Sequence, residues 1–308
     1  LNIRMDEGGR HGQWFYFQLC DVRDTACAIT LDNAGERSYP AGFEHYRVAA
    51  STDLEHWFRI ETTFDGKALR WEVTPASDAI YFAYFAPYTF ERHQQLIART
   101  LASPGVRAQV LCATPDGHPL SLLTLGDPAG DKKACWIIAR QHPGEAMAEW
   151  WIEGFLKRMT DPEDPVARAL LDEAVFYVVP SMNPAGGVRG HLRVNARGVN
   201  LNRAWKTPDA SDSPEVYFVR QRMHETGVEF FLDVHGDEAL PYNFIAGAEG
   251  VPRWTQAMDA DLQGFKQLYA TLSPDFQTTY GYDLDPPNSS DLRKATDYVA
   301  ETFGCLAM

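Results

Sequence analysis

The chain has 308 residues, 45% of them hydrophobic, which is enough to bury the cores of two domains. Its formal net charge of −14 argues against nucleic acid or an anionic membrane surface as a partner, because both require a basic face. There is no apolar run long enough for a membrane span, and no basic stretch followed by an apolar one that would predict a signal peptide. The five cysteines are scattered, mostly within apolar runs, which indicates reduced thiols and a cytoplasmic protein.

Residues 1–86 carry the pattern of a small all-β domain. Short aromatic-rich segments alternate with turn signals such as Asn33-Ala34-Gly35 and Asp65-Gly66. The predicted strands cover residues 14–19, 45–49, 56–60, 69–73 and 79–85. We expect a β-sandwich whose aromatic side chains form its core, with a ligand groove lined by these aromatics as the alternative.

Residues 87–308 alternate between helical and strand patterns. Helices are predicted at residues 89–102, 146–159 and 215–226, and strands at 108–112, 120–125, 135–139, 175–180 and 230–234. This alternation predicts an α/β fold with a mostly parallel mixed sheet and helices on both faces. Binding sites in such sheets form beyond the carboxyl ends of the strands.

Two histidines and a glutamate follow two of these predicted strands. His142 and Glu145 lie three residues apart in a Pro-Gly turn, and this spacing lets both side chains point the same way. His235 ends the second apolar run, residues 230–234. Two histidines and a glutamate are an open zinc set that leaves a position for water or substrate. A histidine after a strand is also often a hydrogen-bonded structural residue, so the H-x-x-E pattern alone is a weak signal.

The order of the motifs between these residues is more specific. Asn183-Pro184-Ala185-Gly186, then Arg193, then Gly198-Val199-Asn200-Leu201-Asn202-Arg203 precede the late histidine. In this order the sequence resembles the zinc metallocarboxypeptidases, and more narrowly the cytosolic carboxypeptidase-like subfamily, over essentially the whole chain. The resemblance implies a carboxypeptidase-like domain at residues 87–308. It also implies that the β-sandwich domain at residues 1–86 precedes the enzyme and has no chemistry of its own.

The resemblance implies one Zn²⁺ per chain, held by His142, Glu145 and His235. A zinc ion in such a site polarises a carbonyl oxygen and lowers the pKa of bound water, which makes amide hydrolysis feasible. Asn200 stands where the family usually has an aspartate that orients a zinc-bound histidine. Asparagine still forms the hydrogen bond but adds no negative charge, so we expect somewhat weaker zinc binding.

The same resemblance gives roles to three residues of the connecting loop. Arg193 falls at the position of the catalytic arginine that polarises the scissile carbonyl, although Arg189 and Arg197 are close enough in sequence to be alternatives. Asn202 and Arg203 match the pair that binds the substrate's C-terminal carboxylate. An arginine fork suits a carboxylate because it donates two parallel hydrogen bonds; an ion pair with the protein's own acids is the other interpretation.

The end of the sequence departs from the family pattern. In the family, the general base is a glutamate on a late strand, typically just after an apolar run like residues 303–308. Glu301 precedes that run and therefore does not match. We interpret the run as a core strand and expect a C-terminal segment beyond Met308 that carries the base.

The expected activity is hydrolysis of the C-terminal peptide bond, or of an isopeptide-like glutamyl bond, in peptides or proteins. The subfamily's association with glutamate-rich ends would require a basic pocket, for which Arg293 and Lys294 are candidates, although residues 291–294 also fit a solvated helix start. Tyr280 and Tyr282 are candidates for a substrate-capping tyrosine. Two other functions fit the same residues: a zinc amidohydrolase of small N-acyl amino acids, and a non-catalytic zinc-containing protein that binds C-termini.

Overall fold

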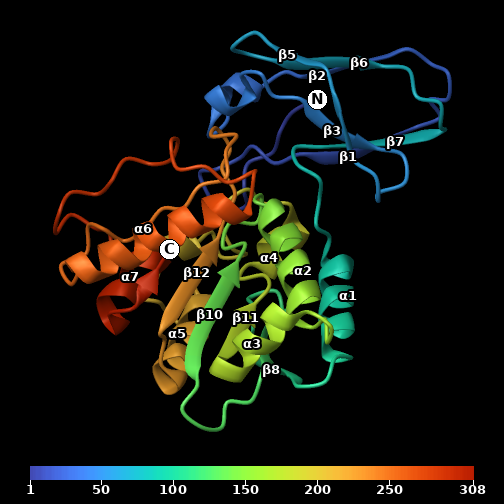
Figure 1. The fold of residues 1–308 in the computed structure, drawn as a ribbon. Coiled ribbons are helices and arrows are strands. Elements are labelled where there is room, and N and C mark those ends of the chain that lie inside the picture. The colour runs from blue at the N-terminus through green and yellow to red at the C-terminus, as the bar shows by residue number, and fades with distance from the viewer.

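The computed structural model describes residues 1–308 and shows a β-rich N-terminal domain above an α/β domain (Figure 1). The first β sheet has the order β1-β7-β3-β4 and the second the order β2-β6-β5, with every pairing antiparallel. These strands are β1 (Tyr16–Cys20), β2 (Cys27–Leu31), β3 (Val48–Ser51), β4 (Phe58–Ile60), β5 (Thr62–Phe64), β6 (Leu69–Val73) and β7 (Ala79–Ala83). Two 3-10 helices, η1 (Ala34–Glu36) and η2 (Pro40–Phe43), connect β2 to β3.

The two sheets share one apolar core, which confirms the predicted β-sandwich. Strand β6 shows the expected alternation, with Leu69 and Trp71 buried and Arg70 and Glu72 exposed. Trp71 packs against Phe82 of the other sheet, with ring centroids 5.4 Å apart, so aromatic residues do fill the core. The sequence analysis missed β2 and β5. Only Glu61 separates β5 from β4, so the pattern across both strands looks like one strand although the chain changes sheets there.

The α/β domain is built on a six-stranded mixed sheet of order β13-β12-β10-β11-β9-β8. Three pairings, β13-β12, β12-β10 and β10-β11, are parallel, and the two that join β9 to β11 and to β8 are antiparallel. The strands are β8 (Val106–Ala113), β9 (Pro119–Leu125), β10 (Lys133–Ala139), β11 (Ala174–Val179), β12 (Phe230–Val234) and β13 (Leu306–Ala307). The predicted mostly parallel mixed sheet is confirmed.

Helices cover both faces of this sheet, as predicted. Successive residues of β10 face opposite sides of the sheet. Ile137 lies in the core formed with α1, α2 and α3, whereas Trp136 lies in the core formed with α5, α6 and α7. The helices are α1 (Phe90–Leu101), α2 (Met147–Met159), α3 (Pro165–Glu173), α4 (Pro184–Arg189), η3 (Leu201–Arg203), α5 (Pro214–Thr226), α6 (Gln256–Leu272) and α7 (Ala295–Phe303). No helix combines the length and the hydropathy that a membrane span requires.

The sequence analysis missed α3, α4 and α6, and it anticipated α7 only as a helix start at residues 291–294. Helix α3 carries a clear start signal, because Asp164 accepts hydrogen bonds from the backbone N–H groups of Val166 and Ala167, and Pro165 follows it. The prediction for residues 303–308 was wrong in its extent. Phe303 ends α7, Gly304 turns the chain at φ +66°, and only two residues then form β13 beside β12.

Candidate metal and substrate site

Two neighbouring strands deliver the two histidines to one edge of the sheet. Strands β10 and β12 are parallel and pair Ala139 with Val234, so the residues that follow them leave the sheet side by side. The backbone N–H of Arg140 donates to the Val234 carbonyl oxygen at 3.1 Å and prolongs this pairing. The turn after Arg140 and the residue after Val234 therefore carry His142 and His235 to the same place.

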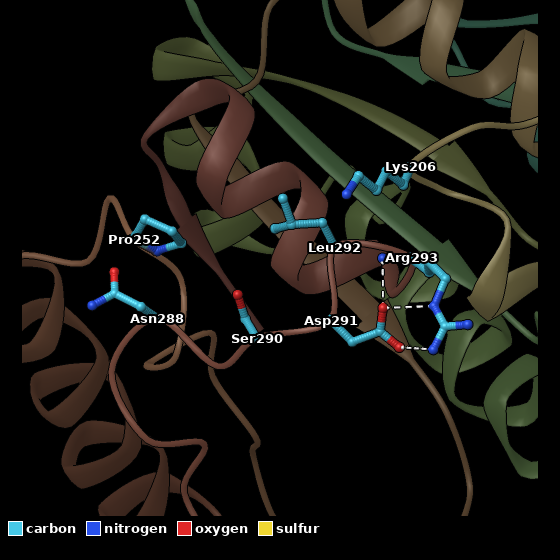
Figure 2. Close-up of a pocket in the computed structure, with 7 residues that line it drawn as sticks. All are labelled: Lys206, Pro252, Asn288, Ser290, Asp291, Leu292 and Arg293. Atoms are coloured by element: carbon cyan, nitrogen blue, oxygen red, sulfur yellow. Dashed lines mark hydrogen bonds and ion pairs between the residues drawn. The ribbon is translucent and has the colours of Figure 1, made fainter.

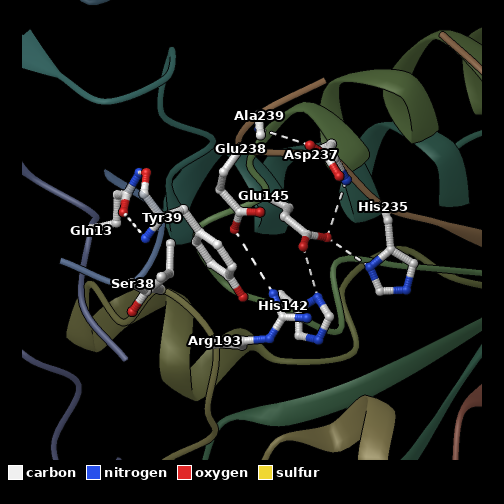
Figure 3. A network of polar contacts seen from close by, with 12 residues as sticks. Gln13, Ser38, Tyr39, His142, Glu145, Arg193, His235, Asp237, Glu238 and Ala239 are labelled. Atoms are coloured by element: carbon white, nitrogen blue, oxygen red, sulfur yellow. Dashed lines mark hydrogen bonds and ion pairs between the residues drawn. The ribbon is translucent and has the colours of Figure 1, made fainter. Parts of the chain in front are cut away.

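The structure brings His142, Glu145 and His235 together. Their ligand atoms all lie within 4.8 Å of one another. Glu145 lies between the imidazoles: its two carboxylate oxygens are each 2.7 Å from a histidine Nδ1 atom, Oε1 from His142 and Oε2 from His235 (Figure 3). Both Nδ1 atoms and the carboxylate thus face one small volume, and this donor set fits a zinc ion.

The electrostatics of these three groups also suit a bound cation. Burial would raise the pKa of Glu145, but the two imidazoles outweigh it and hold that pKa below its usual range, so the carboxylate is ionised as a ligand must be. Burial lowers the pKa of His142. At His235, burial opposes protonation, but the carboxylates of Asp233 and Glu145 prevail and raise the pKa. The site therefore favours a positive charge beside Glu145.

Each histidine has a second partner that fixes its ring. His142 Nε2 lies 3.1 Å from Asn200 Oδ1, so the asparagine makes the contact expected in place of an aspartate. His235 Nε2 lies 2.8 Å from Asp233 Oδ2, which also accepts a hydrogen bond from Gln141. These contacts direct both Nδ1 atoms toward Glu145. The sequence analysis did not assign Asp233, although two residues before His235 on a strand is the position that shares its face.

A buried arginine holds the turn that carries His142 and Glu145. Arg140 has a positive φ of 55° and only 6% exposure. Its side chain donates to the carbonyl oxygens of Pro143 and Tyr88, each at 2.8 Å, and pairs with the buried Glu149. A strained conformation in a turn of this kind is maintained only when its surroundings fix it, and these contacts do so.

The loop that carries Arg193 packs directly on this turn and is held by the N-terminal segment. A Cβ atom on Gly144 would lie 3.0 Å from the Leu192 carbonyl oxygen, so the loop packs tightly on the turn at this glycine. On the other side, the carboxylate of the buried Asp6 accepts three backbone N–H groups in succession, from Leu192 (2.6 Å), Arg193 (2.8 Å) and Val194 (3.2 Å). The Arg193 loop therefore lies between the two domains.

Arg193 reaches the candidate metal site with an unbonded guanidinium. Its side chain is 16% exposed, and its nearest acidic partner is Glu238, 3.9 Å away. Burial raises the pKa of Glu238 to about 8, with a contribution from the negative charge of Glu145. The raised pKa favours the neutral form of Glu238, which weakens its ion pair with Arg193. The sequence analysis did not identify Glu238, which lies three residues after His235 in a loop.

Asn202 lies beside His235, and Arg203 follows it in the chain. Asn202 Nδ2 is 3.3 Å from His235 Nε2, and its side-chain oxygen accepts a hydrogen bond from the backbone N–H of Ala295. The pKa of Arg203 is lowered by burial and then by the charge of Arg193, which shows that the two guanidinium groups share one environment. Asp291 lies 3.9 Å from Arg203.

The structure separates Arg193 from its two sequence neighbours. Arg189 forms a bidentate ion pair with Asp116 and a second pair with Glu7, so its charge is used within the protein. Arg197 makes no side-chain hydrogen bond or ion pair, and only its backbone N–H is bound, by Asn195.

Other candidates lie outside this cluster. Arg293 lines a cavity of about 330 Å³ together with Lys206, but both its Nε and its Nη2 donate to Asp291 at 2.8 Å (Figure 2). Lys294 precedes α7 and pairs with Asp285 and Asp297, each at 2.9 Å, in keeping with a helix start.

The remaining glutamate and tyrosines are also engaged elsewhere. Glu301 accepts a hydrogen bond from the Arg253 backbone N–H at 2.9 Å. Tyr280 stacks on Tyr242 and is 54% exposed, whereas the Tyr282 hydroxyl donates to Asp237, two residues after His235. Of the two predicted tyrosines, only Tyr282 therefore lies beside the histidine-bearing loop.

Comparison with known proteins agrees with this geometry. Residues 1–85 match the family described as the cytosolic carboxypeptidase N-terminal domain, and residues 99–307 match the zinc carboxypeptidase family. A metallo-carboxypeptidase from Burkholderia cenocepacia is 46% identical, with a TM-score of 0.96 over 99% of this chain and 82% of that one. A metallo-carboxypeptidase from Pseudomonas aeruginosa, in complex with (2-guanidinoethylmercapto)succinic acid, is 40% identical, with the same TM-score and coverage.

The similarity extends to the animal enzymes. Cytosolic carboxypeptidase 2 of Homo sapiens is 29% identical over 282 residues, which cover 80% of this chain but only 31% of that protein. The chain therefore spans about a third of the length of that relative. Together with the matched residues 99–307, these comparisons show that the chain belongs to the zinc carboxypeptidase family and carries the N-terminal domain of the cytosolic carboxypeptidases.

Proposed function

We propose that this protein is a zinc-dependent carboxypeptidase that hydrolyses the C-terminal peptide bond of peptides or proteins, including isopeptide-like glutamyl bonds. One observation carries the proposal. The convergent donors of His142, Glu145 and His235 lie beside two guanidinium groups, those of Arg193 and Arg203, of which Arg193 makes no hydrogen bond of its own. A metal set alone would suit many hydrolases, whereas two arginines beside it, one without a hydrogen bond and one bound only to a backbone carbonyl oxygen, suit a substrate that ends in a carboxylate.

His142, Glu145 and His235 would hold one zinc ion, oriented by Asn200 and Asp233. When bound there, zinc supplies Lewis-acid polarisation of a carbonyl and a more acidic water. The protein's part is to fix the ligands before the metal arrives. The hydrogen bonds to the two Nε2 atoms and the clamped turn perform that task.

Arg193 would stabilise the negative charge that develops on the scissile carbonyl oxygen. Its guanidinium is mostly buried, it makes no hydrogen bond within the protein, and its acidic neighbour Glu238 lies 3.9 Å away. A donor fixed in a poorly solvated site stabilises an oxyanion more strongly than water does. The backbone hydrogen bonds to Asp6 keep the loop in place while this charge develops.

Arg203, with the Nδ2 group of Asn202, would bind the terminal carboxylate of the substrate. Arg203 is 41% exposed at its side chain, and its acidic neighbour Asp291 is at 3.9 Å, beyond hydrogen-bond distance. Asp291 is instead bound closely by Arg293. Within the Arg203 fork, Nη1 donates to the Asn202 carbonyl oxygen at 2.6 Å, whereas Nε and Nη2 make no hydrogen bond and remain available for an incoming carboxylate.

The test is hydrolysis of one peptide in two forms, with a free and with an amidated C-terminus, by the zinc-loaded protein. We expect mass spectrometry to show stepwise loss of single residues from the free form and no loss from the amidated form. Cleavage of both forms alike would contradict the role of Arg203. Hydrolysis of N-acetyl amino acids but of no longer peptide would identify a small-molecule amidohydrolase instead, and binding of the peptide without turnover would identify a C-terminus-binding protein.

We further propose that acidic C-terminal residues are preferred and that Lys206 provides the positive charge for them. Lys206 lines the cavity beside Asp291 and has no ion pair, whereas the charges of Arg293 and Lys294 are already paired (Figure 2). We expect Lys206→Ala to reduce the preference for a C-terminal glutamate over glutamine and Arg293→Ala to leave it nearly unchanged. A reduced preference in Arg293→Ala and an unchanged one in Lys206→Ala would instead support the basic pocket expected from the sequence, with Arg293 as its positive charge.

A further inference from the structure

Tyr39 of the N-terminal domain is directed into the candidate site of the other domain. It immediately precedes η2, and its ring lies under the Arg193 guanidinium, whose central carbon is 5.7 Å from the ring centroid. Figure 3 shows the ring reaching from the β domain toward Arg193 and the three candidate ligands. The residue is only partly buried.

The backbone around Tyr39 is fixed with unusual completeness for a loop. Gln13, which has no exposed surface, accepts a hydrogen bond from the Tyr39 N–H and donates one to the Tyr39 carbonyl oxygen, both at 2.8 Å. The same amide donates to the Tyr84 hydroxyl at 3.0 Å, which ties the pair to the core of the sandwich. A rigid backbone lets a side chain bind a ligand at a low entropic cost.

The adjoining helix η2 docks on the loop that follows His235. A Cβ atom on Gly42 would lie 2.3 Å from the carbonyl oxygen of Glu238, so this close approach requires glycine. Tyr39 therefore keeps one position relative to both Arg193 and Glu238. At this point η2 of the N-terminal domain is in direct contact with the loop that follows His235.

The Tyr39 hydroxyl has no hydrogen-bond partner within the chain; only its backbone groups are bound. Burial raises the pKa of the phenol, so it remains a neutral O–H donor at neutral pH. Arg193 affects this pKa more than Arg203 does, as expected if Tyr39 lies on the Arg193 side of the site. Arg203 is the proposed carboxylate-binding group, so Tyr39 is placed toward the part of a peptide that precedes the scissile bond.

We propose that Tyr39 is a specificity-determining residue supplied by the N-terminal domain, whose hydroxyl donates a hydrogen bond to a backbone carbonyl oxygen of the peptide on the N-terminal side of the scissile bond. This inference rests on the proposed carboxypeptidase function and extends it. It assigns a substrate contact to a domain that the sequence resemblance left without chemistry. The contact favours peptides over small N-acyl amino acids, because only a peptide has a carbonyl group at that position.

The test compares Tyr39→Phe with wild type, using zinc-loaded full-length chains. The probes are two hydrolysis-resistant ketomethylene analogues, one of an N-acetyl tetrapeptide and one of an N-acetyl amino acid, with binding measured by calorimetry. Phenylalanine keeps the ring under Arg193 and removes only the hydroxyl. Tyr16→Phe is the matched control, because it removes an exposed hydroxyl of the same domain that packs beside Trp57. Zinc content and circular dichroism verify that each variant is folded.

We expect Tyr39→Phe to weaken binding of the tetrapeptide analogue by about 3- to 10-fold, the value of one hydrogen bond, and to leave the short analogue and the control unchanged. Equal binding of the tetrapeptide analogue by both proteins would overturn the inference. Equal weakening of the binding of both analogues would also overturn it, since Tyr39 would then act only through Arg193. Failure of the wild type to bind either analogue would overturn it as well. Peptide hydrolysis by the wild type is measured separately. If Tyr39→Phe weakens binding of the tetrapeptide analogue but the wild type hydrolyses no peptide, the inference is retained and the proposed function is rejected.

Discussion

The two halves of the candidate site acquire their geometry in different ways. His142, Glu145 and His235 stand just beyond two parallel strands whose register pairs Ala139 with Val234. The loop that carries Arg193 does not continue a strand; it follows the short helix α4. It is instead held by Asp6 from the N-terminal domain, through three backbone hydrogen bonds.

This difference separates what local pattern can specify from what distant contacts specify. A strand followed by a short turn places its next residues at the sheet edge whatever else the chain contains. A loop without regular structure needs external partners for its backbone groups, and here they lie more than 180 residues away along the chain. The N-terminal segment therefore helps to position the proposed substrate site, and the following changes test that view.

The largest effect is expected from Arg193→Ala. Loss of one preorganised oxyanion donor typically reduces kcat by about 10²- to 10³-fold, and the metal ligands are untouched, so zinc content should not change. Peptide hydrolysis rates together with metal analysis check both statements. Arg197→Ala is the matched control, because that side chain makes no hydrogen bond in the same loop. A similar loss in both variants would mean that the loop's charge acts only at long range.

The next effect concerns the stability of the fold and involves Glu215, which contacts Asn195 of the same loop. Glu215 on α5 is fully buried and accepts a hydrogen bond from Asn195, whose own oxygen holds the backbone N–H groups of Arg197 and Val199. Burial raises the pKa of Glu215 from 4.5 to about 7. The neutral form is therefore the favourable one in the fold, and its contribution to stability is lost as the pH rises from about 4.5 to about 7.

Glu215→Gln removes this ionisation. We expect its stability relative to wild type to improve by about 2 kcal/mol between pH 5 and pH 8, measured by urea unfolding. Glu225→Gln, an exposed residue of the same helix, should show no such trend. Parallel pH profiles for wild type and Glu215→Gln would contradict the raised pKa.

Asp6→Asn tests the contact between the domains directly. Asparagine has the shape of aspartate but offers one acceptor and no charge, so the three hydrogen bonds to the Arg193 loop cannot all persist. We expect kcat to fall roughly tenfold, the value of one charge-assisted hydrogen bond, while zinc content is retained. Asp32→Asn, which affects only an exposed pair with the N-terminus, is the control. An unchanged kcat would show that the Arg193 loop keeps its conformation without the hydrogen bonds to Asp6.

The smallest change is expected from Asn200→Asp, a loop residue that contacts the strand-based half of the site. Asn200 contacts His142 Nε2 at 3.1 Å, and a carboxylate there would raise the basicity of the ligand. We expect zinc to bind several-fold more tightly, within the roughly tenfold range of such partners, when measured by competition with a chelator. Weaker binding would mean that the asparagine is the better partner in this setting.

The sequence alone supports the first half of the site better than the second. Residues 135–139 and 230–234 are continuous apolar runs that each end near a histidine, so both the strands and the approach of His142 to His235 could be predicted. Asp6, Tyr39 and Glu238 carry no such signal, since nothing in their neighbourhoods indicates which distant loop they contact. Among the helices, α3 could also have been predicted, because Asp164-Pro165 is a typical helix start. The run 303–308 was misread because a helix end and a two-residue strand share one apolar pattern.

The most direct test of the account is native mass spectrometry of the purified protein beside His142→Ala, Glu145→Ala and His235→Ala. The account predicts one zinc ion per wild-type chain and its loss from each variant at zinc concentrations that saturate the wild type. His56→Ala, an exposed histidine of the β domain paired with Asp53, should retain the metal. A full zinc complement in the three site variants, or none in the folded wild type after zinc is supplied, would contradict the assignment of this site.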